Sequence, residues 1–204
     1  MTELAELLEV YRHLWVRPDS PWAQHEADNL QRMLDFLASS PHAFERSHPP
    51  GHFTGSALVC DAPMHKVALT HHRKLDKWLQ FGGHADGDNN LARVALREAE
   101  EESGLNRLTY LDYEENLHCP HHPVPFDLDI HEIPARGPDP AHLHYDVRFL
   151  LWSNEQALQV NHESHQLAWF NLEEARQHTQ EESMLRQFSK LELLRRTVTV
   201  SARN

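Results

Sequence analysis

The chain has 204 residues, of which 31 are acidic, 19 basic and 18 histidine, and its formal net charge is −12. An acidic surface repels nucleic-acid backbones, so we expect no nucleic-acid polymer as a partner. No apolar run approaches the ~20 residues that cross a membrane, and the acidic start MTELAELLEV lacks the basic start of a signal peptide. We therefore expect a cytoplasmic protein with no membrane partner. Its two cysteines, Cys60 and Cys119, fit no disulfide framework.

The N-terminal part of the chain predicts two helices. Apolar residues recur at helical spacing over residues 3–15 and again over about 22–39, and prolines separate the two segments. Residues 1–45 are therefore expected to form a helical hairpin ahead of a second domain over 46–204. The hairpin serves either packing within the chain or homodimerisation.

The rest of the chain predicts a sheet with three helices. After a linker at 48–51, period-two or short apolar segments predict strands, and helical spacing predicts helices. The expected strands lie at 53–60, 66–70, 78–81, 108–117, 126–134, 143–152 and 166–170, and the expected helices at 91–103, 172–178 and 181–196. Strands mixed with helices favour an α/β sandwich around a mixed sheet.

Three glutamates stand out on the helix that is predicted after Asn90. Asn90 is a good N-cap, and Gly104 stands where helices end in a left-handed conformation. The apolar stripe of the first half of the helix continues into Glu98, Glu101 and Glu102. These like charges repel one another and lie at the helix end whose dipole disfavours anions. A bound divalent cation would compensate both costs, since Mg²⁺ prefers carboxylate oxygens. A solvated helix face is the alternative.

The segment around these glutamates, GGHADGDNNLARVALREAEEESGL, resembles the Nudix box G-x5-E-x7-R-E-U-x-E-E-x-G-U, in which U is a bulky aliphatic residue. Gly83 matches the first glycine, and 97–105 match the second half, with the small residue Ala99 at the first U position. Asn89 stands where the family has a glutamate that pairs with the box arginine, which puts the ion pair of Arg97 in doubt. The resemblance identifies the chain as a Nudix (MutT-like) hydrolase. It implies a Nudix α/β/α sandwich with a mixed sheet, here preceded by the N-terminal hairpin.

The same resemblance implies the chemistry. In the family, the glutamates of the box bind Mg²⁺ or Mn²⁺; here Glu101 and Glu102 would be the core ligands and Glu98 a further ligand or the base. The carbonyl of Gly82 would complete the coordination. The substrate is a nucleoside diphosphate linked to another group, whose diphosphate bond water hydrolyses while a carboxylate accepts the proton. Family members often use another acid before a late strand, and Glu163 is the candidate here; an ordinary loop glutamate is the alternative.

Two residues near the box are candidates for substrate binding. His84 directly follows the glycine pair, where polar residues of the family approach phosphate or metal. Arg73 ends a strand ahead of the box and could meet phosphate, although a solvated loop is the simpler interpretation. Cys119 lies between histidines, but its spacing lacks the second cysteine pair of a zinc site.

A polar face is expected on two neighbouring strands. His142, His144, Asp146 and Arg148 alternate with apolar residues in AHLHYDVRF, so they point to one side of a strand. His131 shows the same alternation in FDLDIHEIP. We expect this face to recognise substrate, to bind a second metal through imidazole, or to be the solvated side of an antiparallel sheet.

Two other functions stay open. Asn89 and the N-terminal helices are compatible with a catalytically weak, ligand-sensing Nudix module, although a pure sensor need not keep three costly carboxylates. An isomerase of allylic diphosphates is the other alternative. That chemistry needs a nucleophilic cysteine, and neither Cys60 nor Cys119 makes a compelling case. Substrate specificity is expected to reside in loops that vary on a shared fold.

Overall fold

The computed structural model of the protein describes residues 2–111, 123–137 and 140–201, with side chains described as far as residue 196. The helices are α1 (Glu3–Trp15), α2 (Ala23–Ser39), α3 (Leu91–Ser103), α4 (Leu172–His178) and α5 (Glu182–Ser201). The strands are β1 (Gly51–Asp61), β2 (Lys66–His72), β3 (Lys77–Leu79), β4 (Phe81–His84), β5 (Thr109–Tyr110), β6 (Asp127–Ile133), β7 (His142–Ser153) and β8 (Ser164–Asn171). They hydrogen-bond in the order β3-β2-β1-β7-β5, with β4 also on β1, β6 on β7 and β8 on β2.

The described residues form two compact units. The first unit contains residues 2–56, 82–95, 123–137 and 140–149. The second unit contains residues 57–81, 96–111 and 150–201.

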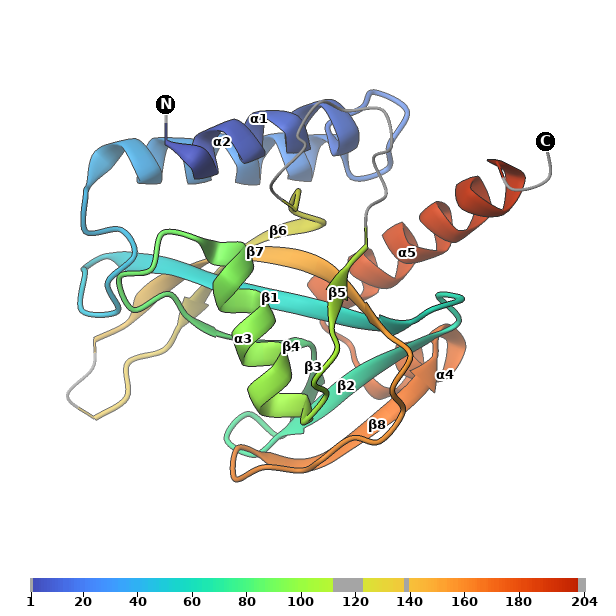
Figure 1. The fold of residues 1–204 in the computed structure, drawn as a ribbon. Coiled ribbons are helices and arrows are strands. Elements are labelled where there is room, and N and C mark those ends of the chain that lie inside the picture. Colours follow the sequence, from blue (N-terminus) through green and yellow to red (C-terminus); the bar gives the residue numbers. More distant parts are fainter. Residues whose placement is uncertain (1, 112–122, 138–139, 202–204) are drawn as a thin grey trace. The chain divides into compact units, whose positions relative to one another are not determined.

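Helices α1 and α2 of the first unit run side by side (Figure 1). Leu4, Leu8 and Tyr11 lie on the buried stripe of α1, as the helical spacing predicts. The hydroxyl of Tyr11 donates a hydrogen bond to the buried carboxylate of Glu26 on α2. The N-terminal helix pair is therefore joined by apolar packing and by a buried polar contact.

The helix pair of the first unit packs on one face of β6 and β7. Phe36 of α2 stacks on Tyr145 of β7 with the ring centroids 3.9 Å apart. The side-chain amide of Asn29 donates a 3.1 Å hydrogen bond to the carbonyl of Leu128 in β6. This face carries the apolar residues of the alternating pattern, so the polar residues of β7 point to the other side of the strand.

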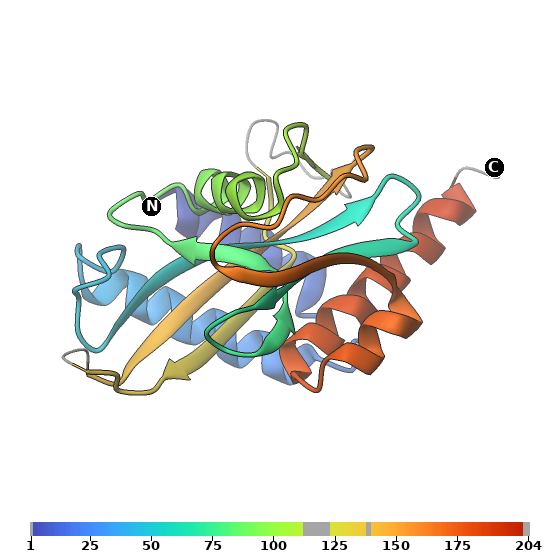
Figure 2. The ribbon, with the colours of Figure 1, turned by 90° about the horizontal axis from the view of Figure 1, so that it is seen from below.

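Strands β6 and β7 run side by side as an antiparallel pair (Figure 2, yellow and light orange). Their register aligns the polar residues of the two strands across the ladder. The aligned pairs are His131 with His144, Asp129 with Asp146, and Asp127 with Arg148. Since directly opposed residues share a face, the pattern gathers histidine and charged residues in one place.

The second unit is built on β2, which pairs antiparallel with both β3 and β8. Helix α4 begins with a capping box, in which the Asn171 side chain accepts from the Glu174 amide and the Glu174 carboxylate accepts from the Asn171 amide. Met184, Phe188 and Leu191 of α5 are fully buried. No helix in the described part of the chain is long and apolar enough to cross a membrane.

Most expected elements are confirmed, and the expected class, an α/β fold with a mixed sheet behind an N-terminal helix pair, is confirmed with them. Helices over 3–15, 91–103 and 172–178 have the expected bounds. The single strand expected over 78–81 is wrong, because the chain forms two strands separated at Gln80. Strand β1 begins at Gly51, within the segment expected to be a linker. The domain boundary near residue 45 stays a prediction.

Candidate functional site

Helix α3, which carries the three glutamates, begins and ends as its sequence predicts. The side-chain oxygen of Asn90 accepts a 2.9 Å hydrogen bond from the Arg93 amide, so Asn90 is the N-cap. Gly104 has a φ of +73°, and its amide donates to the carbonyl of Glu100 at 2.9 Å. Both ends are therefore fixed by local interactions, which set the register of the glutamates.

The glutamates differ in burial. Glu102 is buried, with 7% of its surface exposed, and it shares the buried register with Ala99 and Ser103. The Glu98 side chain is 20% exposed, whereas Glu101 is exposed. The expectation that all three continue the inward-facing stripe is wrong for Glu101, because the 3.6-residue period moves the buried face toward Ala99 and Glu102. The last turn of α3 thus presents one buried, one half-buried and one exposed carboxylate.

The box arginine has an ion-pair partner despite the change at Asn89. A guanidinium nitrogen of Arg97 lies 2.7 Å from a carboxylate oxygen of Glu98. Arg97 therefore pairs with its neighbour Glu98, while the position of the family's usual partner holds the uncharged Asn89. The pair also holds the Glu98 carboxylate in a defined orientation at the helix surface.

A loop ahead of β8 is hydrogen-bonded to the C-terminal end of α3 within the second unit. The amide of Gln159 donates to the carbonyl of Ser103 at 2.8 Å. The side chain of Asn161 donates to the carbonyl of Glu101 at 3.4 Å, and its oxygen accepts from the amide of Glu163 at 2.9 Å. Asn161 therefore connects the backbone of the glutamate turn to the backbone of the candidate acid Glu163.

Arg73 has a structural role in this loop. Its Nε and Nη2 donate to the carbonyls of His162 and Ser164 at 3.0 and 2.9 Å, and its amide donates to the carbonyl of Glu163 at 2.8 Å. Three hydrogen bonds thus anchor the segment that carries Glu163. Phosphate binding by Arg73 stays a prediction.

Gly82 of the first unit lies where only glycine fits. A Cβ at this position would overlap the side chain and the Cα of Ser56 on β1. The close approach of the two strands therefore needs a residue without a side chain. Metal coordination by the Gly82 carbonyl stays a prediction.

Five histidines of the first unit lie together on four neighbouring strands, β4, β1, β7 and β6. The ring centroid of His52 lies 4.8 Å from that of His144 and 5.1 Å from those of His84 and His142. His142 and His144 are 5.3 Å apart, and His131 lies 5.4 Å from His144. We call these five residues the histidine cluster. The structure thus brings together four residues that the sequence singles out, and adds His52.

At the centre of the histidine cluster, His52 is buried and His144 is half-buried. Burial, followed by the neighbouring His84 and His142, lowers the pKa of His52 to about 4. Burial lowers the pKa of His144 to about 2, with His52 contributing next. Both ring nitrogens of His52 and the Nε2 of His144 are buried without a hydrogen-bond partner in the described structure. Each such atom costs roughly 1–3 kcal/mol.

Charged residues next to the cluster form a buried network. Arg148 contacts Asp146 at 2.7 Å, Asp129 at 3.1 Å and Asp127 at 3.2 Å. Arg148 is 3% exposed and Asp146 is 2% exposed, so the interpretation of this face as solvated is wrong for both residues. His131 joins the network through a 3.0 Å contact of its Nδ1 with Asp129.

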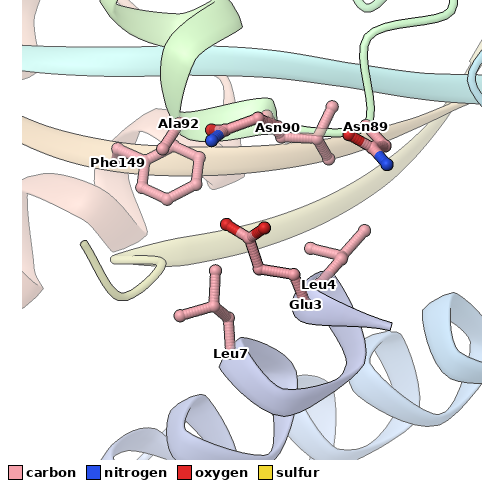
Figure 3. Close-up of a pocket in the computed structure, with 8 residues that line it drawn as sticks. Glu3, Leu4, Leu7, Asn89, Asn90, Ala92 and Phe149 are labelled. Atoms are coloured by element: carbon pink, nitrogen blue, oxygen red, sulfur yellow. The ribbon is translucent and has the colours of Figure 1, made fainter. Parts of the chain in front are cut away.

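Asn89, the one departure from the box, lines a small cavity beside α1 (Figure 3). The cavity measures about 10 Å³, far below the roughly 300 Å³ that a nucleotide-sized ligand needs. Its other lining residues come from α1, from the start of α3 and from β7: Glu3, Leu4, Leu7, Asn90, Leu91, Ala92 and Phe149. A glutamate at position 89 would place a second carboxylate in the surroundings of Glu3, which like charges disfavour. The uncharged amide of Asn89 avoids this repulsion next to α1.

His52 is the residue of the cluster that sequence reasoning misses. The sequence places it in a linker, with the following strand expected to begin at residue 53. The segment HFTGS alternates His52, Thr54 and Ser56 with Phe53 and Gly55, and this period of two is the indication that could have found it. Cys119 and its neighbouring histidines lie outside the described residues.

Comparisons with known proteins agree with this architecture. A family model described as the NUDIX domain matches residues 52–191, more than half of the chain. A hydrolase of the NUDIX family from Clostridium perfringens is 25% identical, with a TM-score of 0.50 over 70% of this chain and 97% of that one. The dihydroneopterin triphosphate pyrophosphohydrolase of E. coli is 17% identical, with a TM-score of 0.51 over 68% of this chain and 92% of that one. No curated protein matches the sequence. The chain belongs to the NUDIX family.

Proposed function

We propose that the protein hydrolyses a diphosphate bond in a small molecule linked to a nucleoside diphosphate, with Mg²⁺ or Mn²⁺ as cofactor. One observation carries the proposal. The last turn of α3 bears Glu98, Glu101 and Glu102, and Asn161 connects this turn to the loop of Glu163. Membership of the NUDIX family and the 25% identity to a family hydrolase support the same class of reaction.

The donor set fits a hard divalent cation. Glu98, Glu101 and Glu102 are spaced at three and four residues on one helix, so their carboxylates emerge from neighbouring positions. Mg²⁺ and Mn²⁺ prefer oxygen ligands, which the three carboxylates supply. A bound ion of this kind neutralises diphosphate oxygens and lowers the pKa of an attacking water.

The chain's own carboxylates would share the remaining work. Glu101 and Glu102 hold the cation, and either Glu98 or Glu163 accepts the proton of the attacking water. Glu98 has the advantage of a fixed orientation from Arg97, 2.7 Å away. Glu163 has the advantage of a loop anchored by Arg73, whose Nη2 donates to the carbonyl of the next residue. Asn161 is a positioning residue, because its contacts are to backbone atoms of both segments.

The substrate class is proposed on chemical grounds. A chain with a net charge of −12 binds an anionic molecule only where cations neutralise the site locally, which favours a compact diphosphate over a polynucleotide. Contacts of His84, His131, His142 and His144 with the substrate stay a prediction. A homodimer through α1 and α2 also stays a prediction.

The test is a release assay on the purified full chain. Nucleotide sugars, ADP-ribose, dinucleoside polyphosphates, nucleoside triphosphates and a pterin triphosphate are incubated with Mg²⁺ or Mn²⁺, and nucleoside monophosphate, inorganic phosphate and pyrophosphate are quantified. We expect turnover of at least one compound, dependent on the divalent cation. No turnover across the panel would contradict the proposal.

Matched variants identify the residues responsible. Glu101→Gln combined with Glu102→Gln should reduce kcat/KM by at least about 10³-fold, because it removes two anionic ligands. Glu100→Gln lies on the same turn outside the ligand set and should change kcat/KM less than about 3-fold. Glu163→Gln with unchanged kcat would assign the base to Glu98. Equal activity of the double variant and the wild type would remove the proposed role of the helix.

A further inference from the structure

The proposed hydrolysis assigns no role to the histidines at the centre of the histidine cluster. We propose that His52, His142 and His144 form a binding site for a transition-metal cation of the Zn²⁺ type, built from residues other than the glutamates of α3. One ligand nitrogen from each of the three residues lies within 4.8 Å of the others. No other group of three or more histidine, cysteine or acidic residues in the described structure comes together in this way.

The spacing of the nitrogens suits one ion. Three nitrogens bound to a common Zn²⁺ at about 2.0–2.1 Å in a tetrahedral arrangement lie about 3.4 Å apart. The separation of at most 4.8 Å is within about 1.4 Å of this value, a difference of the size that side-chain rotations can close. Three protein ligands also leave one coordination position open for an additional ligand.

The backbone holds the three residues in register. His142 and His144 are two residues apart on β7 and so point to the same side of the sheet. The amide of Leu143, between them, donates a 2.9 Å hydrogen bond to the carbonyl of Pro50, and β1 follows directly with His52. The two strands thus present three imidazoles to one point, and sites on strands are more precise than sites on loops.

Hydrogen bonding leaves the correct nitrogens available. The Nδ1 of His142 lies 2.9 Å from the carbonyl of Pro140, which can only accept, so Nδ1 carries the proton and the neutral ring keeps its lone pair on Nε2. Such an outer hydrogen bond is the usual companion of a metal-ligating histidine. Both nitrogens of His52 and the Nε2 of His144 are buried without a partner in the described structure. A cation would take the lone pair of one His52 nitrogen and that of the His144 Nε2.

Nearby charge favours a cation over an anion. Three carboxylates, those of Asp127, Asp129 and Asp146, contact the guanidinium of Arg148 beside the cluster, so acidic groups lie close to the site. His131, opposite His144 on the ladder, is held by Asp129 at 3.0 Å. The same carboxylate of Asp129 thus contacts both Arg148 and the histidine at the edge of the cluster.

The ligand type selects the cation. An all-imidazole set suits Zn²⁺, Co²⁺, Ni²⁺ and Cu²⁺, whereas Mg²⁺ and Ca²⁺ require oxygen ligands. The site would therefore take a different ion from the one proposed for Glu98, Glu101 and Glu102. This difference allows the two sites to be tested separately.

The test is direct metal binding by the full chain after removal of metals with a chelator. Co²⁺ is titrated and followed by its d–d absorption, and Zn²⁺ is then added in competition. We expect one equivalent of Co²⁺ to bind with nitrogen coordination and to be displaced by one equivalent of Zn²⁺. An excess of Mg²⁺ should not displace it.

Four variants assign the ligands. His142→Gln and His144→Gln should each weaken Co²⁺ binding by more than about 10-fold. Replacing a residue that only hydrogen-bonds to a metal ligand already costs about 10-fold, so loss of the ligand itself should cost more. His165→Gln removes an exposed histidine of β8 and should leave binding unchanged. The double variant Glu101→Gln and Glu102→Gln should also bind Co²⁺ as the wild type does. Far-ultraviolet circular dichroism confirms folding of each variant, and His142 is half-buried, so its replacement is expected to be tolerated.

Three outcomes would overturn the proposal. The first is that the wild type binds neither Co²⁺ nor Zn²⁺. The second is that the folded His142→Gln and His144→Gln variants bind Co²⁺ as tightly as the wild type does. The third is that only the glutamate double variant loses binding. None of these outcomes depends on hydrolysis. A failure of the proposed diphosphatase activity therefore leaves this test intact.

Discussion

A Cβ atom on Gly104 would lie 2.6 Å from the Cβ of Gln159. This close approach joins the end of the glutamate helix to the loop that leads to Glu163, and the Gln159 amide reinforces it by donating to the Ser103 carbonyl at 2.8 Å. Gly104 therefore serves two purposes. It ends α3 in a left-handed conformation, and it leaves room for the loop.

The stability losses of Gly104→Ala and Gly87→Ala, compared with each other, should separate the cost of the left-handed conformation from the cost of the overlap with the loop. Gly87 has a φ of +86°, and a Cβ at this position would meet nothing within 4 Å, so its replacement should cost about 1–2 kcal/mol from backbone strain alone. Gly104→Ala adds the overlap with Gln159 and should cost at least about 1 kcal/mol more. Urea unfolding of both variants measures the difference. Equal costs would show that the loop moves away freely.

Arg148→Met should strongly destabilise the protein. Arg148 is 3% exposed and contacts buried Asp127 and Asp146 and half-buried Asp129, so its removal takes a buried cation away from three carboxylates. A loss of roughly 3–5 kcal/mol in the free energy of unfolding is expected. The control is Arg93→Met, since Arg93 is exposed and pairs with Asp88 at the surface; its unfolding midpoint should be unchanged. Similar midpoints for both variants would contradict a structural role for the buried network.

The elements of the fold are predictable where local interactions decide them. Asn90 and Gly104 mark the ends of α3 by capping, and both marks are readable in the sequence because each end needs a particular residue type. The three glutamates can also be identified as a group from the sequence, because like charges at helical spacing repel one another and indicate a compensating ligand. The burial of each glutamate cannot be predicted from the sequence, because it depends on which residues pack against the helix.

The histidine cluster is predictable only in part. The alternation in β7 places His142, His144 and Arg148 on one side of a strand, but it does not say whether another element covers that side. The buried location of Arg148 is a tertiary effect. His52 escapes prediction because its short segment follows prolines, which makes a linker the simpler interpretation. Its contact with His144 brings together residues about ninety positions apart, and such non-local pairing has no local pattern.

Asn161→Ala should lower catalytic rate more than stability. Asn161 contacts the Glu101 carbonyl and the Glu163 amide, so its loss loosens the loop of the candidate acid. We expect kcat to fall about 10- to 100-fold, since small misplacements of a reacting group are costly, while KM changes little. The matched control is Asn106→Ala, because the Asn106 side chain donates to the Gly104 carbonyl at the same helix end, whereas its contact with that loop, to Glu155, is made by the backbone amide, which alanine keeps. A fall in KM and kcat together, or an equal effect of both variants, would argue against positioning by Asn161.

The thiol of Cys60 should be unreactive in the folded protein. Cys60 is fully buried, and burial, followed by the charge of Asp61, raises the pKa of its thiol to about 12. At about pH 8 the thiolate fraction is then on the order of 10⁻⁴, which is too low for a nucleophile. In a Cys119→Ser variant, a disulfide reagent should label no thiol until urea unfolds the chain, after which it should label one. Rapid labelling of the folded variant would restore Cys60 as a candidate nucleophile. Complete protection removes this residue from any isomerase mechanism that requires a thiolate.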